Sequence, residues 1–109
     1  MFNDKFKIFT FLLITISLRT TQTFADEIKV AVASNFYPVI KEIALQYEIE
    51  KFGTSKSHEI VLIPGSSGKH YAQIINGAPF DIFLSADKVR PALLEKNGLS
   101  ENGSRFTYA

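Results

Sequence analysis

The chain has 109 residues, and its 12 lysines and arginines against 11 aspartates and glutamates give a formal net charge of +1. Hydrophobic residues make up 46% and charged residues 21% of the sequence, which is the balance of an ordinary foldable protein. The absence of cysteine excludes disulfide frameworks, thiolate metal sites, iron–sulfur clusters and cysteine nucleophiles. The net charge is near zero and the sequence has no basic runs, so it does not indicate the basic surface that binds nucleic-acid phosphates. We therefore expect no nucleic-acid partner.

The N-terminal segment has the three-part pattern of a secretory signal peptide. Two lysines lie among the first seven residues, the apolar run Ile8–Leu18 follows, and the small residues Thr23 and Ala25 precede the expected cleavage position. The apolar run is too short for a membrane span, which needs roughly 20 apolar residues. We therefore predict a signal peptide over residues 1–25 and export of the remaining chain.

Residues 26–109 alternate between predicted strands and predicted helices, which indicates an α/β fold with a parallel sheet and right-handed crossovers. Short apolar runs predict strands over residues 28–33, 59–64 and 80–84. The last residues, 105–109, resemble the opening of a further strand. We therefore interpret residues 26–109 as a partial N-terminal lobe that is truncated at its C-terminus.

Three helices are predicted between these strands and after them. The first carries an apolar stripe at helical spacing and ends at about Phe52; the stripe consists of Phe36, Ile40, Ile43, Ala44 and Tyr47. The second is predicted over residues 69–76, and the third runs from about Lys88 to Asn97.

Polar turns follow the first two predicted strands, at the sheet edge where open α/β sheets bind ligands. Ser34 and Asn35 form one turn, and Gly65–Gly68 (GSSG) forms the other. Hydroxyl groups, together with the free N–H groups of a helix N-terminus, suit an anion. The alternative is that Ser34 and Ser67 are plain helix caps. The pattern alone leaves both interpretations open.

The composition of the two turns limits the kind of anion. Neither turn contains Asp or Glu, so the predicted site offers donors and no acceptor for a protonated oxyanion such as hydrogen phosphate. A fully ionised tetrahedral dianion, such as molybdate, tungstate or sulfate, needs no such acceptor. Lys69 is the only cation close by in the sequence, and we interpret it as a solvated side chain.

Four segments resemble the periplasmic molybdate-binding proteins of ABC transporters. They are Val30–Phe36 (VAVASNF), Gly65–Lys69 (GSSGK), Gly77–Asp87 (GAPFDIFLSAD) and Arg105–Ala109 (RFTYA), of which the third is the most specific. The resemblance covers about residues 28–109. Structural roles are expected for three polar residues of the third motif, with the last one capping the third helix: Asp81, Ser85 and Asp87.

The resemblance implies a two-lobed clamshell protein, with a three-layer parallel sheet in its first lobe, that captures molybdate or tungstate in the periplasm and delivers it to a membrane permease. One hydroxyl donor would be Ser34 with Asn35 beside it, and the second would be Ser67 with Ser66 as its neighbour. Molybdenum would be held as the oxyanion by Ser34 and Ser67, with no cofactor and no metal ion coordinated by the protein. The folded chain is expected to be monomeric.

The chain departs from that family in length, because family members are well over twice as long and take further anion contacts, often including a tyrosine, from the part that is absent here. Tyr108 lies too early in the chain to replace that tyrosine. Two alternatives are therefore a truncated fragment without anion binding and an interaction module that pairs through its open sheet edge. A sulfate-type oxyanion binder is a further alternative.

The sequence does not support an enzyme. A phosphate-binding loop of the Walker type needs Gly and Ser or Thr where this chain has Ile63 and His70. The nucleophile-elbow pattern fails because Lys69 stands at its second glycine position. Nothing in the spacing of Ser67, His70 and Asp81 supports a catalytic triad, so we expect no catalytic residues.

Overall fold

The computed structural model describes residues 26–53 and 58–108. The predicted signal peptide therefore lies outside the described residues. The elements follow one another as β1 (Asp26–Ala33), α2 (Tyr37–Phe52), β2 (His58–Gly65), α3 (Ser67–Ile75), β3 (Ile82–Leu84) and α4 (Val89–Lys96). Within the described part of the chain, no helix is long and apolar enough to cross a membrane.

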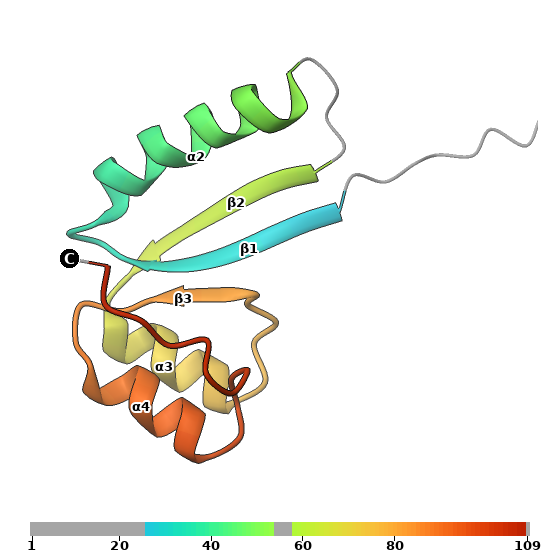
Figure 1. Cartoon of the computed structure of the whole chain (residues 1–109). Helices are drawn as coiled ribbons and strands as arrows, with labels where there is room; N and C mark the ends of the chain where they lie inside the picture. Colours follow the sequence, from blue (N-terminus) through green and yellow to red (C-terminus); the bar gives the residue numbers. More distant parts are fainter. Residues whose placement is uncertain (1–25, 54–57, 109) are drawn as a thin grey trace, which may run out of the picture.

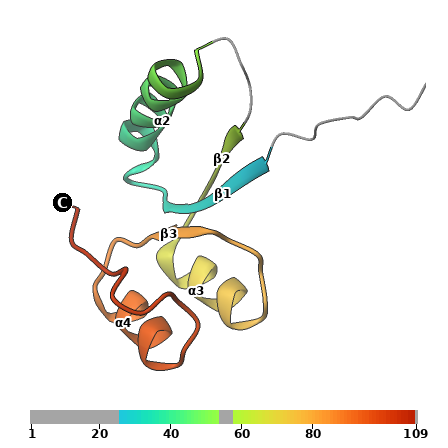
Figure 2. The same ribbon diagram turned by 45° about the vertical axis from the view of Figure 1, so that its right-hand side comes forward.

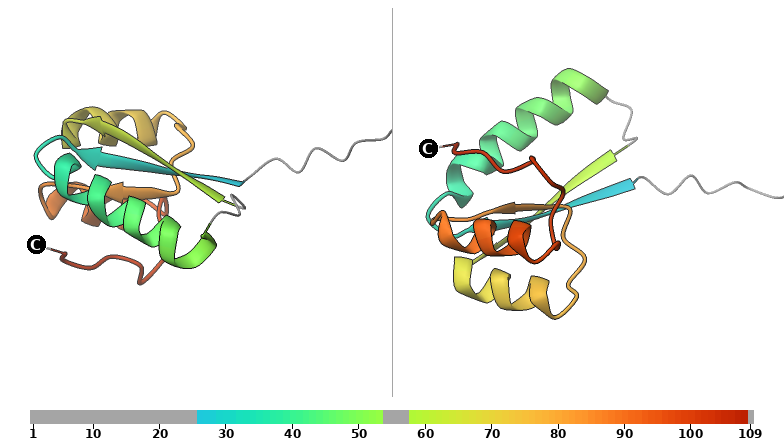
Figure 3. Two further views of the ribbon diagram at one scale, coloured as in Figure 1. Left: turned by 90° about the horizontal axis from the view of Figure 1, so that it is seen from above. Right: turned by 60° about the horizontal axis from the view of Figure 1, so that its bottom comes forward.

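The three strands form one parallel sheet in the order β2-β1-β3. Ala33 of β1 is in register with Gly65 of β2, and Val32 is in register with Leu84 of β3, so the carboxyl ends of all three strands meet at one edge. Helix α2 lies on one side of the sheet and α3 and α4 lie on the other (Figures 1 and 2), an arrangement that both views of Figure 3 repeat. The predicted three-layer parallel α/β architecture is confirmed.

The core is centred on β1, the middle strand. Val30, Ala31, Val32 and Ala33 are all buried, because a strand with a neighbour on each edge and helices on both faces has no side open to water. From the helical layers, Leu94 of α4 is also buried. This explains why the sequence of β1 is a continuous apolar run.

Helix α2 is covered less completely than its apolar stripe predicts. Ile40 and Ala44 are partly buried, whereas the side chains of Ile43 and Tyr47 are 52% and 45% exposed. Toward its C-terminal end, the helix is joined to the edge strand β2 by Glu48, whose Oε1 accepts a hydrogen bond from the N–H of Ile60 at 2.9 Å. Three of the five stripe residues are therefore partly buried, and two remain largely exposed to water.

Two predicted strands differ in the structure. β3 begins at Ile82 instead of Phe80, and Asp81 before it is fastened to Lys29 of β1 by two hydrogen bonds of 2.8 Å, one from the Asp81 N–H and one to its carboxylate. The structural role expected for Asp81 is thus confirmed. Residues 104–108 form no strand, because Arg105 bonds to Glu95 of α4 and the end of the segment turns toward the carboxyl edge of the sheet.

Candidate anion-binding site

The turn after β1 holds Ser34 and Asn35 beside the end of β2. The N–H of Phe36 donates to the carbonyl oxygen of Ala33 at 2.9 Å, which places Ser34 and Asn35 in the middle of a tight turn. The N–H of Ser34 donates to the carbonyl oxygen of Gly65, also at 2.9 Å. Both side chains are exposed, and neither has a hydrogen-bond partner among the described residues. Their polar groups are therefore available to a ligand.

The turn after β2 gives its two serines different roles. Ser66 is the N-cap of α3, and its Oγ accepts a hydrogen bond from the N–H of Lys69 at 3.2 Å. Ser67 is the first residue of the helix and is only 8% exposed. Helix α2 has Phe36 at its N-cap position and no side-chain cap. The alternative that Ser34 and Ser67 are plain caps is therefore wrong for both residues, because Ser66 caps α3 and no side chain caps α2.

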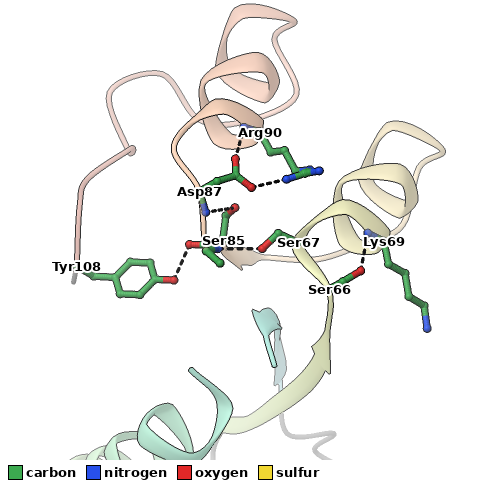
Figure 4. A network of polar contacts seen from close by, with 8 residues as sticks. Ser66, Ser67, Lys69, Ser85, Asp87, Arg90 and Tyr108 are labelled. Atoms are coloured by element: carbon green, nitrogen blue, oxygen red, sulfur yellow. Dashed lines mark hydrogen bonds and ion pairs between the residues drawn. The ribbon is translucent and has the colours of Figure 1, made fainter. Parts of the chain in front are cut away.

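The Ser67 hydroxyl is oriented by the turn that follows β3. Its Oγ accepts a hydrogen bond from the N–H of Ala86 at 2.9 Å (Figure 4). Because this bond uses a lone pair of the oxygen, the hydroxyl proton remains free to donate to another acceptor. Ser85, also 8% exposed, accepts a bond from the N–H of Asp87 at 3.2 Å, which braces the same turn.

Tyr108 brings the end of the described chain to this edge of the sheet. Its hydroxyl donates to the carbonyl oxygen of Ser85 at 2.7 Å, and its ring centroid lies 4.7 Å from that of Phe36. Burial raises the pKa of the Tyr108 hydroxyl, so the group stays a neutral donor across the physiological range. The sequence analysis named Tyr108 only as too early in the chain to replace the family's tyrosine, and no local pattern predicts its contact with Ser85, which lies 23 positions away.

The cation near the β2–α3 turn is Arg90, which sequence reasoning did not single out. A Cβ atom on Gly68 would lie 3.2 Å from the guanidinium nitrogen of Arg90. Lys69 is exposed, and its side chain extends away from Ser67 (Figure 4), as expected of a solvated lysine. Arg90 is paired with Asp87, so its charge is already partly balanced.

Asp87 bonds to the first turn of α4 as the predicted cap would, from one residue before the N-cap position, Lys88. Its Oδ1 accepts a hydrogen bond from the Arg90 N–H at 2.9 Å, and its Oδ2 binds the Arg90 guanidinium group (Figure 4). The bond from the Arg90 N–H lowers the pKa of the Asp87 carboxyl group, against the opposing effect of desolvation and with help from the guanidinium charge. The carboxylate faces α4, where these donors occupy it.

His70 belongs to the core and not to a catalytic triad. It is 1% exposed, its Nδ1 lies 3.1 Å from Oε1 of Gln73, and its ring meets those of Phe80 and Phe83 edge-on. A Cβ atom on Gly65 would lie only 2.7 Å from its Nε2, so the absence of a side chain there makes room for the imidazole. The Asp81 carboxylate bonds to β1 instead, so the imagined triad is not assembled.

Comparison with known proteins connects this fold to anion-binding relatives. The chain is 47% identical over 85 residues to the molybdate-binding protein ModA of Azotobacter vinelandii, and 45% identical over the same length to the ModA of Rhodobacter capsulatus. Each match covers 78% of this chain and 32% of the relative. The chain therefore spans about a third of the length of these relatives.

The solved structure of the periplasmic molybdate-binding protein of Azotobacter vinelandii has a similar fold. The two superpose with a TM-score of 0.67 at 41% sequence identity, over 73% of this chain and 32% of that one. In addition, the family model described as bacterial extracellular solute-binding protein matches residues 28–109, which include all the turns described above. The chain belongs to the family of bacterial extracellular solute-binding proteins.

Proposed function

We propose that this chain binds a tetrahedral oxyanion, molybdate or tungstate, at the carboxyl edge of its sheet. The observation that carries the proposal is the bond from the Ser34 N–H to Gly65, which sets the two serine turns side by side. Ser34 and Ser67 are the main hydroxyl donors in this proposal. Asn35 and Ser66 lie beside them and complete the set.

The donors at this edge favour an anion without a proton of its own. Ser67 has already accepted a hydrogen bond and can donate, and the exposed Ser34 hydroxyl has no competing partner in the described part of the chain. The carboxylate of Asp87, which follows the Ala86 N–H that binds Ser67, is held by Arg90 and is therefore not a free acceptor for a protonated oxyanion. The printed names of the similar proteins support molybdate within this class, and sulfate is the weaker candidate.

The wider role follows from the same comparison. A periplasmic location and delivery of the anion to the membrane permease of an ABC transporter fit a member of this family that resembles molybdate-binding proteins. Such a role is capture and release, with no catalysis and no cofactor. The turns described above offer donors from one side only, so an anion held by them stays partly hydrated, and we expect these donors alone to bind it more weakly than an enclosed site would.

The test is calorimetric titration of the full chain, expressed with its own N-terminal segment and purified. Circular dichroism first establishes that the sample is folded. Molybdate and tungstate should bind saturably and phosphate should not, while the double variant Ser34→Ala, Ser67→Ala should lose the binding. Ser100→Ala, at an exposed serine outside the two turns in the sequence, is the matched control. A folded wild-type chain that gives no heat with molybdate would overturn the proposal and favour a fragment without anion binding.

A further inference from the structure

We propose that Tyr108 is a positioning residue of the oxyanion site. It contacts the turns after β1 and β3 and so keeps the Ser67 hydroxyl oriented to donate a hydrogen bond to the anion. This inference rests on the proposed function and adds to it a residue outside the two serine turns. Tyr108 would not touch the anion itself. It would act through the peptide group between Ser85 and Ala86, because Tyr108 bonds to the carbonyl oxygen of that group and Ser67 Oγ bonds to its N–H.

The contacts behind this proposal join segments that lie far apart in the sequence. The Tyr108 hydroxyl donates to the Ser85 carbonyl at 2.7 Å, and the next residue, Ala86, donates its N–H to Ser67 Oγ at 2.9 Å (Figure 4). Two hydrogen bonds in series therefore connect the end of the described chain to the buried serine of α3. Movement of the β3–α4 turn would change the direction in which the Ser67 proton points.

The tyrosine ring also contacts the turn after β1, which contains Ser34. Its centroid lies 4.7 Å from that of Phe36, and Phe36 closes the tight turn that contains Ser34. The opposite side of that turn is tied to β2 through the bond from the Ser34 N–H to Gly65. Tyr108 thus braces both donor turns at once, through its hydroxyl on one side and its ring on the other.

Preorganisation gives these contacts a functional consequence. A hydroxyl that is already oriented loses less conformational freedom when the anion arrives, so the anion binds more tightly for the same contact. Removing only the Tyr108 hydroxyl should leave the ring packing intact and release the β3–α4 turn. The loss of one such hydrogen bond should weaken anion binding about three- to tenfold.

The experiment compares Tyr108→Phe with the matched control Tyr71→Phe in the full chain labelled with nitrogen-15. Tyr71 lies on α3, and within residues 26–53 and 58–108 its hydroxyl has no hydrogen-bond partner. Amide hydrogen exchange at Ala86 reports the bond to Ser67, and exchange at Val30 in the core reports global stability. Molybdate titration of the same samples gives the dissociation constants.

Relative to the wild type, Tyr108→Phe should accelerate exchange more at Ala86 than at Val30, and it should raise the dissociation constant for molybdate about three- to tenfold. Tyr71→Phe should change neither quantity. Equal acceleration at both amides would show a general contribution to stability and overturn the inference, as would unchanged molybdate affinity in Tyr108→Phe. A folded wild-type chain that does not bind molybdate would instead overturn the proposed function and, with it, the ligand role of Tyr108.

Discussion

Ser34 and Ser67 differ in how much of each side chain is already used by the fold. Ser34 is exposed and its hydroxyl has no hydrogen bond within the described residues, whereas Ser67 is buried and accepts the Ala86 N–H. A residue that serves only a ligand can be replaced without cost to folding. One that also satisfies a backbone donor cannot, because the donor loses its partner.

Stability measurements should therefore separate the two serines. We expect Ser67→Ala to lower the free energy of unfolding by about 1 kcal/mol, since the Ala86 N–H loses its part-buried hydrogen bond. Ser34→Ala should change that free energy by less than about 0.5 kcal/mol, as at other exposed positions. Urea unfolding followed by circular dichroism measures both. Equal losses in the two variants would contradict the hydrogen-bonding role assigned to Ser67.

At the scale of elements, α4 depends on the cap that Asp87 provides. The carboxylate accepts the Arg90 N–H and pairs with its guanidinium group, and these donors hold the pKa of the carboxyl group below its ordinary value. The resulting stabilisation is fully present above the pKa of the unfolded chain. It is lost as the pH falls through the lower pKa of the folded chain.

The variant Asp87→Asn should remove that pH dependence. Asparagine can still cap a helix, but it has no charge to lose in acid. We expect the stability difference between wild type and Asp87→Asn to be largest near neutral pH and to shrink below about pH 4, where an ordinary aspartate begins to protonate. Urea unfolding across this range is the measurement. A difference that stays constant down to the acid limit would argue against a stabilising ionised Asp87.

Most of the elements could be predicted from the sequence, because local patterns determine them. The apolar run of β1, the end of α2 at Phe52 and the bond from Asp87 to the start of α4 can each be predicted from a few neighbouring residues. What could not be predicted depends on distant contacts. Ser66 and Ser67 are equally good caps by sequence, and the contact that buries Ser67 comes from Ala86, 19 positions away.

Contacts between distant residues also limit what the sequence could predict about the site and about α2. The two serine turns were predicted to lie together, and the bond from Ser34 to Gly65 confirms that they do. No role at that edge was predicted for Tyr108 or Arg90, because only tertiary packing brings them there. An apolar stripe on a helix likewise indicates a face suited to burial, but it does not say how much of that face a neighbour covers.

At the scale of the whole molecule, the packing is uneven between the two faces of the sheet. The buried residues lie mainly along β1 and on the side of α3 and α4 (Figure 1). On the other side, α2 leaves large apolar side chains in water, with Leu45 60% and Ile49 61% exposed. The residues buried along β1 and beside α3 and α4 should therefore contribute most of the free energy of unfolding. The exposed apolar side chains of α2 should contribute very little.

Substitutions in the two regions should separate accordingly. Val32 is fully buried in the central strand, so Val32→Ala should cost about 2 kcal/mol through lost apolar burial and the space left behind. The double variant Leu45→Gln, Ile49→Gln removes two exposed apolar side chains and should change stability by less than about 1 kcal/mol, because each stays largely in water in either state. Urea unfolding measures the free energies, and sedimentation tests whether the exposed flank promotes self-association. A loss from the α2 variant as large as that from Val32→Ala, in a sample that sediments as a monomer, would mean that α2 stabilises the fold through a contact its exposure does not reveal.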